Sequence, residues 1–138
     1  MSKQFVVQLK NQPGALATLA ERLAARGVDL RAIGGGGIGD SGHVIMTTAD
    51  DDATREILQT DAYTYIEGDS ILAEVDDRPG GMARIARELA DAGVNVYGHL
   101  FLGRWGDRAM FTFVVDRPDV ARPILERKSE VDTHLSGM

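Results

Sequence analysis

The sequence predicts an α+β fold made of two similar units, residues 1–69 and 70–138. A sixteen-residue segment that begins at Pro13 returns 66 residues later at Pro79, with eight of its sixteen positions identical. In both copies, runs of alternating apolar residues flank runs whose apolar residues recur every three or four positions, which are the patterns of strands and helices. The length of 138 residues accommodates two such small units.

The first copy is expected to contain four strands and two helices. The helix over Pro13–Arg26 carries one apolar stripe; Pro13 suits the first turn of a helix, and Gly27 suits the left-handed residue after its end. The remaining elements are expected to be strands over Phe5–Leu9, Val28–Ile33, His43–Ala49 and Tyr63–Ile66, and a helix over Asp52–Thr60.

The segment Gly34–Gly42 is predicted to be the loop between two of these strands. Its first six residues match G-x-G-x-x-G, but a dinucleotide fingerprint must open a helix, and the next element here is the strand His43–Ala49. The dinucleotide interpretation is therefore rejected. A mobile hairpin loop and a ligand lid both remain open for this segment.

The second copy repeats the order of elements. Strands are expected over Ile71–Asp76, Val94–Leu102, Arg108–Asp116 and Val131–Leu135, and helices over Pro79–Ala92 and Pro118–Lys128, with Pro123 a defect in the last helix. Each copy is then a β-α-β-β-α-β unit of the ferredoxin-like kind, with two helices on one face of an antiparallel sheet. Units this small bury little core alone, so the copies are expected to pair side by side, within one chain or across a homodimer.

Composition narrows the classes of function. The chain has no cysteine, no apolar run of the roughly 20 residues that span a membrane, and a net charge of −6. Neither half is basic, which argues against nucleic-acid binding. No signal peptide is visible, and the cytoplasm is the expected compartment. The acidic run Asp50–Asp52 precedes a helix, where carboxylates complement the helix dipole, and it lacks the spacing of a calcium loop.

The two Pro-Gly turns resemble those of ACT domains. In the first copy the motif is Asn11-Gln12-Pro13-Gly14, followed after the helix by Gly27-Val28-Asp29-Leu30. In the second copy it is Asp77-Arg78-Pro79-Gly80, followed by Gly93-Val94-Asn95-Val96. The similarity covers nearly all of the chain, and Asp29 departs from the Asn that many members carry.

The resemblance implies a non-catalytic regulatory protein that binds a small effector, most often an amino acid, and acts through a regulated enzyme or regulator. It also implies side-by-side pairing into one continuous sheet, with ligands between the Pro-Gly loop of one domain and the second strand of its neighbour. The residues that the resemblance assigns to binding are Asn11, Gln12, Pro13, Gly14, Asp77, Arg78, Pro79 and Gly80 in the loops, and Asp29 and Asn95 in the strands.

These residue types suit a free amino acid. A Pro-Gly turn that opens a helix leaves backbone N–H groups and the positive dipole end for a carboxylate. Across paired copies, Asn11 would face Asn95, and Asp77 would face Asp29; the second pair would prefer an ammonium or another cation. Backbone geometry alone also explains Pro and Gly at such a turn, and Asp or Asn before a helix is an ordinary cap, so these structural readings stay open.

Aromatic residues concentrate in the second copy. Tyr97, His99 and Phe101 are expected to alternate onto the bare face of the sheet, where they would form a partner surface; the alternative is packing at an edge within the monomer. The three histidines form no metal-ligand pattern, and no nucleophile, base and orienting group can be identified together. We therefore expect no metal, no cofactor and no catalysis. The alternatives are an assembly module without a ligand, or a small enzyme on the same scaffold.

Overall fold

The computed structural model describes residues 2–127, so the expected strand over Val131–Leu135 lies outside the described part of the chain. The chain divides into two compact units, Met1–Asp69 and Ser70–Met138. No helix in the described part is long and apolar enough to cross a membrane.

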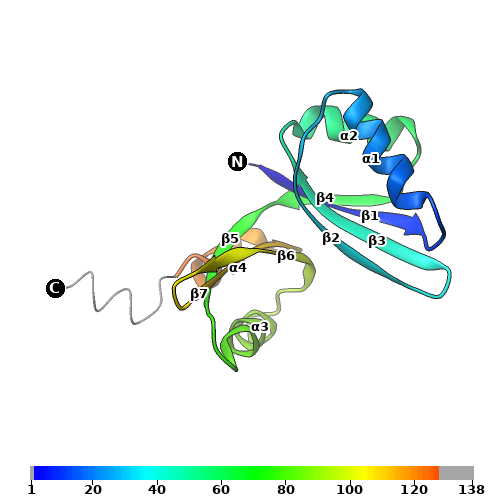
Figure 1. The fold of residues 1–138 in the computed structure, drawn as a ribbon. Helices are drawn as coiled ribbons and strands as arrows, with labels where there is room; N and C mark the ends of the chain where they lie inside the picture. The colour runs from blue at the N-terminus through cyan, green and yellow to red at the C-terminus, as the bar shows by residue number, and fades with distance from the viewer. Residues whose placement is uncertain (1, 128–138) are drawn as a thin grey trace. The chain divides into compact units, whose positions relative to one another are not determined.

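The first unit is a four-stranded antiparallel sheet with both helices on one face (Figure 1). The strand order in the sheet is β2-β3-β1-β4, so β2 is an edge strand. Its elements along the chain are β1 (Lys3–Lys10), α1 (Ala15–Ala25), β2 (Leu30–Ile38), β3 (Ser41–Thr48), α2 (Asp51–Thr60) and β4 (Tyr65–Asp69).

The core of the first unit lies between this sheet and the two helices. Phe5 and Met46 from the sheet are fully buried there, against Leu19 and Leu23 of α1 and Leu58 of α2. Of the apolar stripe that the sequence shows on the first helix, Leu19 and Leu23 are thus the part that packs in the core.

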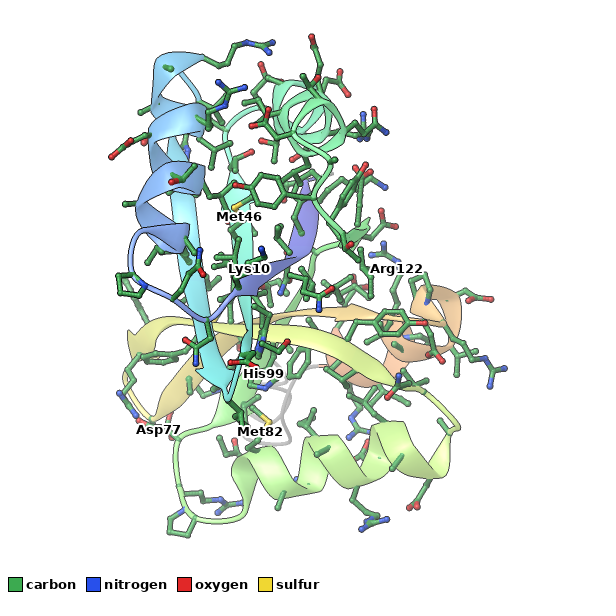
Figure 2. The ribbon with its side chains drawn as sticks, turned by 90° about the vertical axis from the view of Figure 1, so that its right-hand side faces the viewer. Lys10, Met46, Asp77, Met82, His99 and Arg122 are labelled. Carbon is green, nitrogen blue, oxygen red and sulfur yellow. The ribbon has the colours of Figure 1, made fainter. Side chains whose placement is uncertain are left out.

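The second unit repeats the arrangement with three described strands in the order β5-β7-β6. Its core joins Ile85 and Leu89 of α3 and Leu125 of α4 to inward residues of the strands, and Met82 packs against this core from the first turn of α3 (Figure 2). The elements are β5 (Ile71–Asp76), α3 (Gly81–Asp91), β6 (Val96–Trp105), β7 (Arg108–Val115) and α4 (Pro118–Leu125). The α+β fold class and its two ferredoxin-like units are confirmed.

The glycine run is not a loop. Gly34 to Gly37 continue β2 and pair in antiparallel register with Ile45 to Gly42 of β3. The turn of the hairpin is confined to Gly39 and Asp40, and Gly39 has the positive φ of 61° that such a turn requires. The predicted loop over Gly34–Gly42 is therefore wrong, because ladder hydrogen bonds use only backbone groups, which glycine supplies as well as any residue.

His99 and Phe101 of β6 lie on the helix side of their sheet. His99 and Phe101 pair directly with Phe113 and Phe111, and directly opposed residues in an antiparallel pair share a face. The ring centroids of Phe101 and Phe111 are 5.5 Å apart, and Phe113 belongs to the core. The prediction that the stripe of Tyr97, His99 and Phe101 faces the bare side is therefore wrong for His99 and Phe101. A β-bulge at Tyr97 shifts the alternation that the sequence pattern assumes.

Candidate functional site

A groove of about 450 Å³ opens in the first unit where α1 begins, on the helix side of β2. Its apolar walls come from Leu9, Leu16, Ile33 and Val44. Leu16 and Ile33 are about half exposed, at 52% and 48%, so apolar surface is available to an occupant. The floor along β2 is formed at Gly35 and Gly37, which face the helix side of the sheet and contribute no side chain.

The Pro-Gly loop forms the polar end of this groove. Gln12 lines the groove. Asn11 connects the loop to the hairpin turn through hydrogen bonds. The side chain of Asn11 donates a hydrogen bond of 2.8 Å to the carbonyl of Gly39, and its backbone N–H donates to the carbonyl of Asp40 at 3.0 Å. Asn11 also lies directly over Gly37, since a Cβ built on that glycine would come within 2.7 Å of the Asn11 amide carbon.

The first turn of α1 is uncapped. Its cap residue is Gly14, whose left-handed φ of 89° explains the glycine, and no side chain within residues 2–127 caps the helix amides. The helix α2 of the same unit differs, because Asp50 accepts a hydrogen bond of 3.0 Å from the N–H of Ala53. The free N–H groups and the positive dipole end of α1 are therefore left for a ligand or for water.

The second Pro-Gly loop is built on the same plan with other side chains. Gly80 is again a left-handed, uncapped helix start, with φ of 91°. The backbone N–H of Asp77 donates to the carbonyl of Asp107 at 2.8 Å, as Asn11 does to Asp40. Here, however, the loop carboxylate accepts a hydrogen bond of 2.8 Å from the guanidinium of Arg104, beside the tip of the β6–β7 hairpin (Figure 2).

The two strand residues of the predicted site lie away from the loop of their own unit. Asp29 follows α1, and eleven helical residues, about 16 Å of helix, separate the two ends of that element. Asp29 is exposed and lies 3.6 Å from Arg31. The backbone N–H of Asn95 instead donates a hydrogen bond of 2.9 Å to the carboxylate of Asp116. Whether Asp29 and Asn95 meet the loop of another copy stays a prediction.

In the structure, predicted site residues of the first unit lie together at one groove, and further residues that the sequence did not indicate line the same groove. Asn11, Gln12 and the start of α1 lie together at one groove. The missed residues are Lys10 at the end of β1 (Figure 2), Leu16, Ile33 and the glycine floor. The glycine run is the sequence feature that could have indicated this floor. Because clustered glycines suggest a loop, the sequence pattern does not place the run in a strand beside the helix.

This chain resembles known proteins in structure and not in sequence. No protein-family model and no curated protein matches the sequence. Among solved structures, protein BT0572 from Bacteroides thetaiotaomicron matches with a TM-score of 0.68 and 21% identity, over 91% of this chain and 86% of the other.

Two further matches are regulatory subunits. The regulatory subunit of aspartate kinase from Thermus thermophilus, in a ligand-free form, has a TM-score of 0.58 and 18% identity, covering 91% of each chain. The corresponding subunit from Thermus flavus has a TM-score of 0.60 and 17% identity, over 91% of this chain and 90% of that one. At these identities the likeness establishes the fold.

Proposed function

We propose that this chain, which has the ACT-type fold in duplicate, is a non-catalytic regulatory protein that binds a small carboxylate-bearing metabolite. An amino acid is the simplest ligand of that kind. In this proposal the occupied protein acts on a partner, either an enzyme or a regulator, in the cytoplasm. The likeness in fold to regulatory subunits supports the regulatory role.

The observation that carries the proposal is the uncapped start of α1 at the mouth of a groove. The groove of about 450 Å³ falls within the usual range for small-molecule sites. A carboxylate placed there would accept hydrogen bonds from helix amides that no side chain in the described part of the chain uses. Asn11 and Gln12 supply neutral polar contacts, and the apolar walls suit the rest of the ligand.

The proposal for the second unit uses the equivalent loop. Arg78, Pro79 and Gly80 form the turn, and Asp77 supplies a carboxylate. The strand residues Asp29 and Asn95 join these sites only if a loop of one copy faces the strand of another. Such pairing, like the homodimer, is part of the proposal.

A thermal-shift screen against the common amino acids and their 2-oxo acids tests this function. A ligand present at a hundredfold excess over its dissociation constant stabilises the folded protein by about 2.7 kcal/mol. Sodium acetate at equal concentration is the control, because it carries a carboxylate but too little apolar surface to fill the groove. If no compound raises the melting temperature more than acetate does, the ligand-binding role is wrong.

A second function, assembly without a ligand, is favoured by two exposed apolar residues at hairpin tips. Ile38 is 90% exposed at the end of β2, and Trp105 is 81% exposed at the end of β6. A protein contact that covered these side chains would remove their apolar surface from water. Light scattering on the wild type and on Trp105→Ser tests assembly through this tip: a lower mass in the variant supports it, and an equal mass in both proteins counts against it.

A further inference from the structure

The two units carry equivalent grooves with different contents. In the second unit a groove of about 400 Å³ lies between the Pro-Gly loop and β6, on the helix side of the sheet. Strand register matches Phe101 with Gly35 of the first unit, and after the bulge that follows Phe101 it matches Arg104 with Gly37. The similar volumes therefore conceal a difference in the side chains along the edge strand.

The charged groups around the second groove are already paired with one another. Arg104 bonds to Asp77 at 2.8 Å, and its guanidinium carbon lies 4.9 Å from the centre of the Phe101 ring. The carboxylate of Asp76 is held by the buried guanidinium of Arg108 and lies 3.3 Å from Arg78. A ligand carboxylate would have to displace these pairs, at a cost in lost charge-assisted hydrogen bonds.

Among the residues that the structure describes, the lining of the first groove has no such ion pairs. Along its described lining the only formally charged side chain is that of Lys10, for which the described part of the chain provides no ion pair. No acidic side chain lines this groove within residues 2–127. The lining therefore favours an anion or a zwitterion over a cation, because an added positive charge would meet no carboxylate.

The floor of the first groove is bare because of two glycines that face it. Gly35 and Gly37 pair with Val44 and Gly42 and share the helix-side face of the sheet. A Cβ on Gly35 would lie 2.3 Å from the carbonyl oxygen of His43, and one on Gly37 would overlap Asn11. Gly36 faces the other way, and a Cβ there would meet nothing within 4 Å.

We infer that the first groove alone takes the ligand, and that the ligand is a monocarboxylate with a short branched aliphatic chain. This inference rests on the proposed function and narrows it. The carboxylate lies at the start of α1, and the aliphatic chain lies over the glycine floor between Leu16 and Ile33. The second groove is closed to this ligand by its Arg104–Asp77 pair and by Phe101.

The aliphatic chain follows from the walls of the groove. Five of the described side chains that line it are apolar, and two of these are about half exposed, so a branched aliphatic group would remove apolar surface of both molecules from water. A charged ligand chain would lose hydration there without gaining an ion pair. The shared chemistry belongs to two metabolite classes, amino acids and 2-oxo acids, which differ in the ammonium group.

Isothermal titration of the whole chain with L-leucine and with 4-methyl-2-oxopentanoate tests the inference, with L-lysine and L-aspartate as charged comparisons. We expect one site per chain for a leucine-like probe and at least tenfold weaker binding of the charged amino acids. Stronger binding of the 2-oxo acid assigns the ligand to that class, and stronger binding of L-leucine assigns it to the amino acids. If neither leucine-like probe binds, or if a charged amino acid binds more tightly, the inference is wrong.

Paired variants locate the site. Gly37→Ala is expected to weaken binding at least tenfold because its Cβ displaces Asn11, whereas Gly36→Ala on the opposite face leaves affinity unchanged. Leu16→Ala, which removes a half-exposed side chain, is expected to weaken binding about fivefold and serves as the second variant if Gly37→Ala fails to fold. Arg104→Ala in the second groove leaves affinity and stoichiometry unchanged.

The outcomes separate this inference from the function on which it rests. Two sites per chain, or a loss of binding in Arg104→Ala with none in Gly37→Ala and Leu16→Ala, overturns the assignment to the first groove while the regulatory function stands. Failure of every amino acid and 2-oxo acid in the thermal-shift screen overturns the function itself.

Discussion

Two leucines on one helix offer a direct test of which face of α1 holds the first unit together. Leu19 is 1% exposed and belongs to the core, whereas Leu16, one turn earlier, is 52% exposed. Replacing either one by alanine removes the same three carbon atoms and changes helix propensity equally. Any difference in stability between the two variants therefore reports burial.

The expected magnitudes follow from that burial. At about 0.8 kcal/mol per buried methylene, Leu19→Ala loses about 2.4 kcal/mol of transfer free energy, and the cavity left behind raises the cost to about 3–5 kcal/mol. Leu16→Ala loses about half of the transfer free energy, roughly 1 kcal/mol, and leaves no closed cavity. The difference between the variants is then about 2 kcal/mol or more.

Urea unfolding followed by far-ultraviolet circular dichroism measures both variants. With a slope of about 1.5 kcal/mol/M, the unfolding midpoint should fall by about 2 M or more in Leu19→Ala and by about 0.7 M in Leu16→Ala. Equal shifts of the two midpoints would show that Leu16 is as enclosed as Leu19. In that case the groove beside α1 would not be open to a ligand.

Three further predictions concern single contacts. Asp50→Ala removes the cap bond to the N–H of Ala53 and is expected to cost about 1 kcal/mol, measured by urea unfolding; an unchanged midpoint would argue against the cap. Ala62→Gly is expected to stabilise the protein by about 0.5–1 kcal/mol, since Ala62 has a strained left-handed φ of 59°, and a lower melting temperature would contradict this. The hydrogen bond from Arg127 lowers the pKa of Glu88 below its ordinary 4.5. This pair therefore stabilises the folded state above about pH 4.5. The stabilisation is lost as the pH falls through the lowered pKa of Glu88. Melting temperatures measured between about pH 3 and pH 7 should fall less steeply in Glu88→Gln, and parallel curves for the two proteins would refute the contribution of this pair.

Periodicity predicted the elements well because burial imposes it. The helix stripes and the strand alternation reflect the faces that pack, and the ends of β5 are those that the sequence indicates. The resemblance to ACT domains, based on two Pro-Gly turns, is confirmed for the fold by the structural comparisons. The acidic run was also interpreted correctly: Asp50 caps α2, and Asp51 and Asp52 lie in its first turn.

The errors arose where the backbone decides the structure. Clustered glycines resemble a loop because they carry no apolar pattern, yet the Gly34–Gly37 run forms regular ladder pairs with β3. The faces of β6 were reversed because a bulge between Val96 and Gly98 inserts one residue, and hydrophobicity gives no sign of it. Sequence pattern shows which residues share a face only while the register is unbroken.

The candidate site was predictable only in its local part. Asn11 and Gln12 are adjacent to the turn that positions them, so the motif itself placed them at the start of α1. The glycine floor and Ile33 reach the same groove through tertiary packing, which no local motif records. The pairing of Asp29 and Asn95 with loops of another copy depends on an arrangement between units and stays a prediction.

The contact between position 35 and the neighbouring strand bears on how these two copies diverged. A side chain at Gly35 would collide with the backbone of β3, yet the second copy carries Phe101 at the corresponding position. The second hairpin accommodates it with one more residue, bulged between Phe101 and Gly103. Point substitutions alone therefore do not convert one groove into the other. The conversion also requires the insertion or deletion of one residue in the hairpin. Engineering an exchange of ligand preference between the halves of this chain would require transplanting the whole hairpin.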